Sequence, residues 1–145
     1  MNTNPLVGTW RLVSFEVRAS DGRVSHPYGP DATGYIIYSP DGYMSVTITA
    51  ADRPNFDASD LLGGSVEERA EAAGTYVSYC GTYEVQDATV VHRVQMSLFP
   101  NWVGTEQVRF YELKGDRLHL STAPMLLGGS EQRAQLIWER VPSAG

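Results

Sequence analysis

The sequence predicts an all-β fold: one eight-stranded antiparallel up-and-down barrel with a single short helix. Three observations predict it. The 145 residues include 14 Gly and 8 Pro spread along the chain, which is typical of many turns rather than long helices. Between the turns, apolar and polar side chains alternate, as in strands with one buried face. Eight such runs follow one another at hairpin spacing, and eight strands can close into a barrel with room for one small ligand. The length suits one domain over residues 1–145.

The first third of the chain contains three of these strands. Residues 8–18 form an extended run that ends at a turn on Asp21-Gly22, where a residue that tolerates positive φ is wanted. A loop over residues 26–34 leads into the strand 35–38. Pro40-Asp41-Gly42 then reverses the chain into the strand 43–49, which predicts a hairpin.

The one helix is predicted over residues 65–73. Ser65 has the place of the N-cap and Glu68 follows three residues later, which is the spacing of a capping box. Glu67 and Glu68 also suit the positive end of the helix dipole. We expect this helix to cover one end of the barrel.

Five strands follow without further helical pattern. They are separated by turns at 86–88 and 114–116 and by loops containing Pro100 and Gly128-Gly129, and they span residues 75–85, 89–98, 105–113, 117–122 and 132–141. Strands joined in order by hairpins form a meander, which completes the barrel.

Parity along each strand separates the inner face from the outer face. In the strand 89–98, His92 shares a face with four apolar residues, Val90, Val94, Met96 and Leu98. The same rule turns the following side chains inward on the other strands: Met44, Val46, Ile48, Val77, Tyr79, Tyr83, Val85, Leu118, Leu120, Ala134, Leu136 and Trp138.

The strand 105–113 allows either face to be the inner one. Val108 and Phe110 alternate with Gln107, Arg109, Tyr111 and Leu113, and continuity of the hairpin with Leu118 favours the second set. Arg109 and Gln107 then join His92 and the tyrosines as polar groups of an apolar cavity, which is the usual composition of a small-molecule site. The predicted ligand-binding residues are His92, Arg109, Tyr79, Tyr83, Gln107, Met44, Met96 and Trp138.

Charge and hydropathy limit the partners. The net charge is -6 and no window concentrates Lys or Arg, so nucleic acid is not expected as a partner. No signal peptide and no run of 18 apolar residues is present, so we expect no membrane partner and a cytoplasmic location. Cys80, the one cysteine, is expected to be a packed side chain. Nothing in the sequence specifies an oligomeric state.

Several segments carry a family resemblance over nearly the whole chain. They are residues 8–14 (GTWRLVS), 38–44 (YSPDGYM), 81–83 (GTY), 91–92 (VH), 99–105 (FPNWVGT) and 138–141 (WERV). Together they resemble the bacterial and fungal lipocalin-like domain family, a resemblance that implies the calycin type of barrel. Gly8, Trp10 and Arg140 also resemble the signature of lipocalins at large, which implies that Arg140 packs across Trp10 at the closed end of the barrel.

Metal and cofactor chemistry find little support in the residues. His26, His92 and His119 lie on a loop and two different strands, without the spacing of a metal site. No glycine-rich phosphate loop and no GxSxG nucleophile motif occurs. We therefore expect no metal and no cofactor.

Three functions remain open on the sequence. The leading hypothesis is a module that binds a small, largely apolar molecule bearing a polar or acidic group. The second is a cofactor-independent isomerase, cyclase or dehydratase of specialised metabolism with His92 as candidate catalytic base. The third is a barrel filled by its own side chains. Trp102 is expected to pack outside the barrel, with closure over the barrel mouth as the alternative.

Overall fold

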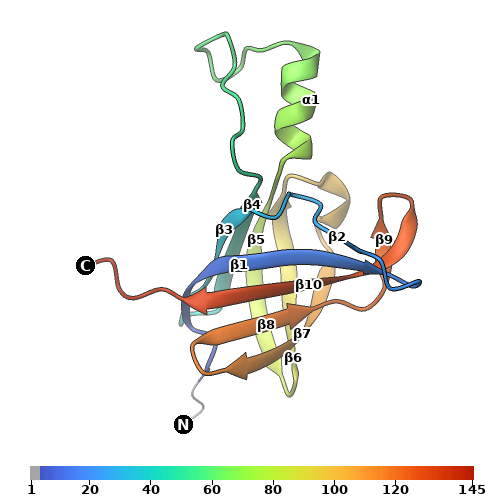
Figure 1. Cartoon of the computed structure of the whole chain (residues 1–145). Helices are drawn as coiled ribbons and strands as arrows, with labels where there is room; N and C mark the ends of the chain where they lie inside the picture. Colours follow the sequence, from blue (N-terminus) through green and yellow to red (C-terminus); the bar gives the residue numbers. More distant parts are fainter. Residues whose placement is uncertain (1–3) are drawn as a thin grey trace.

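The computed structural model describes residues 4–145 and contains one curved antiparallel sheet, one helix and one short 3-10 turn (Figure 1). The strands are β1 (Gly8–Ala19), β2 (Val24–Ser25), β3 (Thr33–Tyr38), β4 (Tyr43–Thr49), β5 (Tyr76–Gln86), β6 (Thr89–Ser97), β7 (Glu106–Lys114), β8 (Arg117–Ser121), β9 (Met125–Leu127) and β10 (Ser130–Arg140). The helix is α1 (Val66–Gly74) and the 3-10 turn is η1 (Pro100–Trp102).

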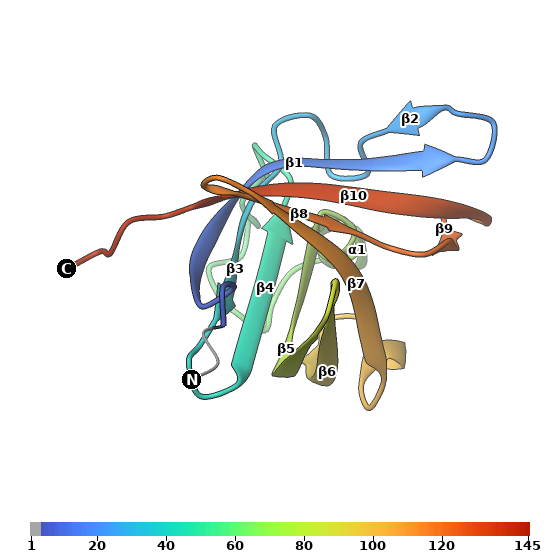
Figure 2. The ribbon, with the colours of Figure 1, turned by 90° about the horizontal axis from the view of Figure 1, so that it is seen from below.

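Eight of these strands close into the predicted barrel. The order is β1-β3-β4-β5-β6-β7-β8-β10, and β10 pairs with β1 from Trp10↔Arg140 to Ala19↔Gln132, so no edge of the sheet is left open between them. The short strand β2 pairs with the C-terminal end of β1, at Val17 and Arg18, and β9 pairs with the N-terminal end of β10. Both short strands lie outside the closed ring (Figure 2). The sequence did not reveal them, because two or three residues are too few to show alternation.

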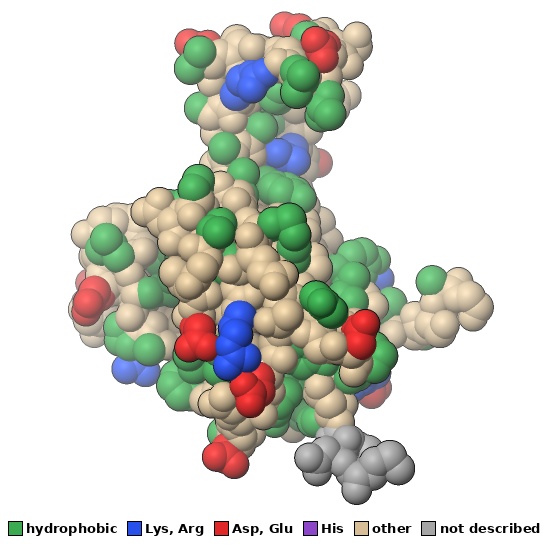
Figure 3. Space-filling view, turned by 180° about the vertical axis from the view of Figure 1, so that it is seen from behind, with side chains coloured by type: hydrophobic (Ala, Val, Ile, Leu, Met, Phe, Trp, Pro, Cys, Tyr) green, Lys and Arg blue, Asp and Glu red, His purple; other side chains and the backbone are tan. Residues whose placement is uncertain are grey.

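Helix α1 forms as predicted but does not cover the barrel. The Ser65 side chain accepts a hydrogen bond from the Glu68 N–H, and the Glu68 carboxylate accepts one from the Ser65 N–H, which completes the capping box. The prediction that this helix covers one end of the barrel is wrong. The segment 50–75, here called the arm, stands clear of the barrel (Figures 1 and 3). No residue of α1 is buried, so the helix lacks the apolar face that would hold it against the strands.

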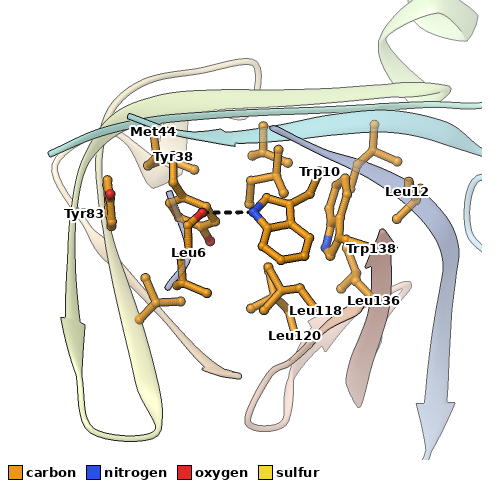
Figure 4. Close-up of a cluster of buried hydrophobic side chains, with 14 of the residues drawn as sticks. Leu6, Trp10, Leu12, Tyr38, Met44, Tyr83, Leu118, Leu120, Leu136 and Trp138 are labelled. Carbon is orange, nitrogen blue, oxygen red and sulfur yellow. Dashed lines mark hydrogen bonds between the residues drawn. The ribbon is translucent and has the colours of Figure 1, made fainter. Parts of the chain in front are cut away.

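One end of the barrel is plugged by aromatic and aliphatic side chains (Figure 4). Leu6, Trp10 and Trp138 are fully buried there, and the Trp10 indole N–H donates to the Leu6 carbonyl at 2.9 Å. The Arg140 guanidinium lies 4.1 Å from the centre of the Trp10 ring and donates to the carbonyls of Val7 and Pro5. The packing implied by the resemblance is therefore confirmed, and it closes this end of the barrel.

Beyond Val94, a β-bulge exchanges the inward-facing and outward-facing side chains of β6. Cys80 pairs with Met96 while Gly81 pairs with Val94, so Gln95 is an extra residue on β6. Met96 consequently shares the outer face with Cys80 and is 63% exposed. The prediction that Met96 and Leu98 face inward is wrong for this reason.

Gly81 allows the strands to approach at the bulge. A Cβ on Gly81 would lie 1.9 Å from the Arg93 carbonyl oxygen, so a side chain cannot be accommodated without moving the backbone.

Candidate ligand-binding site

A cavity of about 130 Å³ lies inside the barrel. Apolar and aromatic side chains supply most of its wall, and few polar groups reach it. The lining residues are Phe15, Pro27, Tyr28, Ile36, Val46, Ile48, Val77, Tyr79, His92, Trp102, Arg109, Leu120, Thr122, Met125, Leu127, Ala134, Leu136 and Trp138. No residue of the arm is among them.

The central polar feature is a chain of three buried side chains from three strands. His92 is 1% exposed. Its Nε2 lies 2.7 Å from the Tyr38 hydroxyl and its Nδ1 lies 2.7 Å from the Tyr79 hydroxyl. Both ring nitrogens therefore have a partner, and the imidazole is fixed in one orientation.

Burial, with a smaller effect of the Arg109 charge, lowers the pKa of His92 from 6.5 to about 3. The imidazole is therefore neutral at physiological pH, with one N–H donor and one acceptor nitrogen. Burial raises the pKa of Tyr38 well above its ordinary value. It also raises the pKa of Tyr79, against an opposing effect of Arg109. All three groups are thus uncharged.

Arg109 brings a positive charge to the cavity wall. On β7 the exposed and sheltered residues alternate strictly, with Gln107, Arg109, Tyr111 and Leu113 on the sheltered side. The inner set chosen from hairpin continuity is therefore correct. The Arg109 guanidinium donates to the Val108 carbonyl and, at 3.4 Å, to the Gln107 side-chain oxygen. Across residues 4–145 no carboxylate pairs with it.

The predicted site residues do not all reach the cavity. Tyr79, His92, Arg109 and Trp138 line it, whereas Met96 is on the outer face. The other three residues, Tyr83, Met44 and Gln107, are outside the lining.

Those three residues have other partners. Tyr83 packs on Tyr38 and donates to the Ser39 carbonyl at 2.7 Å. Met44 pairs with Tyr38 across β3 and β4, so it lies in the same plug (Figure 4). Gln107 contacts the Thr105 hydroxyl and Arg109, so it positions the arginine.

The sequence missed Tyr38, the second partner of His92, and misplaced Trp102. Several lining residues were also not predicted: Phe15, Pro27, Tyr28, Thr122, Met125 and Leu127. Tyr38 bonds His92 although 54 positions separate them; its alternation with Ile36 was the available signal. Trp102 lines the cavity and packs edge-on against Tyr79 at 5.6 Å between ring centres. The expectation that Trp102 packs outside is wrong, because η1 turns its ring back over the barrel.

Within the described residues, no three His, Cys, Asp or Glu side chains converge as a metal site requires. None of the helical segments in residues 4–145 has the length and apolar character needed to span a membrane.

The barrel, the aromatic plug under Arg140 and the internal cavity together define a lipocalin-like protein. The chain matches the lipocalin-like domain family over residues 7–141 and belongs to that family. Among its relatives is the 4'-hydroxy-3'-methoxypropiophenone carrier protein ppsC of Aspergillus oryzae. That protein is 38% identical over 108 residues, which cover 68% of this chain and 97% of the relative.

Two solved structures show weaker overall similarity. The lipoprotein YedD from Klebsiella pneumoniae superimposes with a TM-score of 0.46 at 10% identity, over 98% of this chain and 76% of YedD. A variant of the fluorescent protein UnaG superimposes with a TM-score of 0.38 at 16% identity, over 92% of this chain and 94% of UnaG.

Proposed function

We propose that this protein binds a small, largely apolar molecule inside the barrel and releases it unchanged. The observation that carries the proposal is the cavity: an apolar and aromatic wall interrupted by the buried His92–Tyr79 pair and by Arg109. An apolar wall with a few fixed polar groups is the usual composition of a site that orients a small ligand. A filled barrel would leave no such space.

The size of the cavity supports a ligand with one ring. Its volume of about 130 Å³ is close to that of an engineered apolar cavity of about 150 Å³ that accepts benzene. The name of the fungal relative supports the same scale, because 4'-hydroxy-3'-methoxypropiophenone has one aromatic ring. Being named a carrier, that relative also supports binding without conversion.

The state of His92 favours binding over acid–base catalysis. A general base works best when its pKa is near the working pH, whereas the pKa of His92 is lowered to about 3. Both of its nitrogens are also engaged with Tyr38 and Tyr79. A substrate would have to displace a tyrosine to reach either nitrogen, so the site is better suited to hold a ligand than to remove a proton.

Titration with one-ring molecules tests the proposal. The panel contains 4'-hydroxy-3'-methoxypropiophenone and simpler aryl ketones, and binding is followed by calorimetry and by the fluorescence of Trp102 and Trp138 in the cavity wall. We expect saturable binding at one ligand per chain. The bound compound is then extracted and analysed by mass spectrometry, where an unchanged mass is expected.

A matched pair of variants assigns the binding to the cavity. Ala134→Leu adds volume at a buried position of the cavity wall, whereas Met96→Leu changes an exposed side chain of the same sheet. We expect Ala134→Leu to lose most of the affinity and Met96→Leu to keep it. Absence of binding across the panel would refute the proposal, and steady conversion of a bound compound would replace it with the enzyme hypothesis.

A further inference from the structure

We infer that the cavity selects a ligand by an oxygen atom that only accepts hydrogen bonds, through the Tyr79 hydroxyl and the Arg109 guanidinium. This inference rests on the proposed function and specifies the group that the site recognises. It follows from where each proton of the buried Tyr38–His92–Tyr79 chain must lie.

The tautomer of His92 follows from Tyr38. Tyr38 is 1% exposed, and within residues 4–145 the hydroxyl has one hydrogen-bond partner, His92 Nε2. If Nε2 carried the proton, the hydroxyl hydrogen of Tyr38 would be buried without an acceptor, a condition that folded proteins avoid. Tyr38 therefore donates to a bare Nε2, and the neutral imidazole carries its proton on Nδ1.

This tautomer leaves Tyr79 with a free proton. Nδ1–H donates to the Tyr79 oxygen across the 2.7 Å contact, so the Tyr79 hydroxyl hydrogen is not used in the chain. No acceptor in residues 4–145 receives it. Tyr79 lines the cavity, and an acceptor on a bound molecule would complete its hydrogen bonding.

A further donor on the same wall lacks an acidic partner. Arg109 forms no ion pair within the described chain, and no Asp or Glu lines the cavity. The Trp138 indole N–H also has no hydrogen-bond partner among residues 4–145, but it is fully buried and presents no accessible surface to a ligand. The polar part of the wall is therefore rich in donors and carries positive charge.

The chemistry that fits this wall is one ring bearing a carbonyl or carboxylate oxygen. Either oxygen accepts from Tyr79 and Arg109 and has no hydrogen of its own to place. An alcohol oxygen also accepts, but its hydrogen would have to find an acceptor in a wall that offers few. A hydrocarbon ring would fill the space and leave the donors unpaired.

Four ligands of similar size test the inference by calorimetry: propylbenzene, 1-phenylpropan-1-ol, propiophenone and benzoate. We expect propiophenone to bind about tenfold more tightly than propylbenzene, the effect of one well-placed hydrogen bond, with the alcohol between them. Benzoate distinguishes a carboxylate from a ketone carbonyl as the accepting group. Tighter binding of benzoate than of propiophenone would identify the carboxylate as the preferred group.

Tyr79→Phe is the decisive variant and Tyr76→Phe, on the same strand, is its control. Tyr79→Phe should weaken propiophenone about tenfold and leave propylbenzene binding unchanged, which also shows that the cavity is intact. Equal weakening of both ligands, or wild-type propylbenzene binding as tight as propiophenone, would overturn the inference while the proposed function stands. If none of the four molecules binds, the proposed function and this inference both fail.

The tautomer has an independent readout in the nitrogen NMR spectrum of the imidazole. We expect a protonated Nδ1 and a bare Nε2 for His92 in the free protein. The opposite assignment would return the free proton to Tyr38, which is outside the cavity lining, and would overturn the inference.

Discussion

The buried imidazole of His92 makes the stability of this protein depend on pH. Burial, assisted by Arg109, lowers the pKa of His92 to about 3 in the folded chain, against 6.5 in an exposed histidine. Below about pH 6.5 the unfolded chain therefore takes up a proton at this position that the folded chain does not. The free energy of unfolding should fall as the pH is lowered, from about pH 6.5 toward about pH 3.

The size of the effect follows from the same two pKa values. Each pH unit inside this interval costs about 1.4 kcal/mol for one proton. The lowered pKa values of the Glu68 and Glu84 carboxylates add their own loss below about pH 4.5, so the interval from about pH 6.5 to about pH 4.5 isolates His92. Over those two units we expect a loss of about 2.3 kcal/mol, since the unfolded histidine is already half protonated at about pH 6.5, and this is a large part of the stability of an ordinary domain.

Urea unfolding followed by tryptophan fluorescence at half-unit pH steps measures this loss. His92→Gln is the test variant, since an amide can still donate to one tyrosine and accept from the other without titrating. It should be less stable at pH 7 but nearly independent of pH over the same interval. His26→Gln, on an exposed loop, should keep the wild-type slope. Equal slopes in wild type and His92→Gln would refute the assignment of the proton to this residue.

Three further predictions concern stability and the arm. Tyr38→Phe leaves His92 Nε2 without its donor and should lower the free energy of unfolding by about 1–3 kcal/mol; an unchanged melting temperature would contradict it. Gly81→Ala forces a Cβ against the Arg93 carbonyl and should destabilise by several kcal/mol, measured by urea unfolding against wild type. Ser65→Ala removes the helix cap and should cost about 1 kcal/mol of local stability, seen as faster hydrogen exchange in α1. Ligand affinity should not change, because the arm is not part of the cavity wall.

Most of the barrel could be predicted because local rules decide it. Strand β4 runs from Tyr43 to Thr49 as expected, since a Pro-Asp-Gly turn and strict alternation mark both ends of it. The inner face of β7 followed from the hairpin with β8, where Leu113 pairs with Leu118. Alternation failed on β6 after Val94, since a bulge adds one residue and exchanges the two faces of the strand. A second register shift, between Leu12 and Ser14, interrupts the alternation on β1.

The candidate site was predictable only in part, because its contacts join distant strands. The alternation of side chains along the strands correctly placed four residues on the cavity wall: Tyr79, His92, Arg109 and Trp138. Parity carries no information on depth along the barrel axis, so Tyr83 and Met44 were assigned to the site although they belong to the plug. The depth of a side chain depends on the stagger of all the strands in the closed barrel.

Local patterns in the chain specify the strand order, the helix cap and the face of most side chains, because turns, caps and alternation act over a few residues. The aromatic plug under Arg140 was also foreseeable through the family resemblance. Three features of the site have no local signal: Tyr38 and Tyr79 share His92, Trp102 packs against Tyr79 in the cavity wall, and the Trp138 N–H has no partner among residues 4–145. Those facts depend on closing the sheet, which brings residues far apart in the chain within hydrogen-bond distance and fixes which donors remain free.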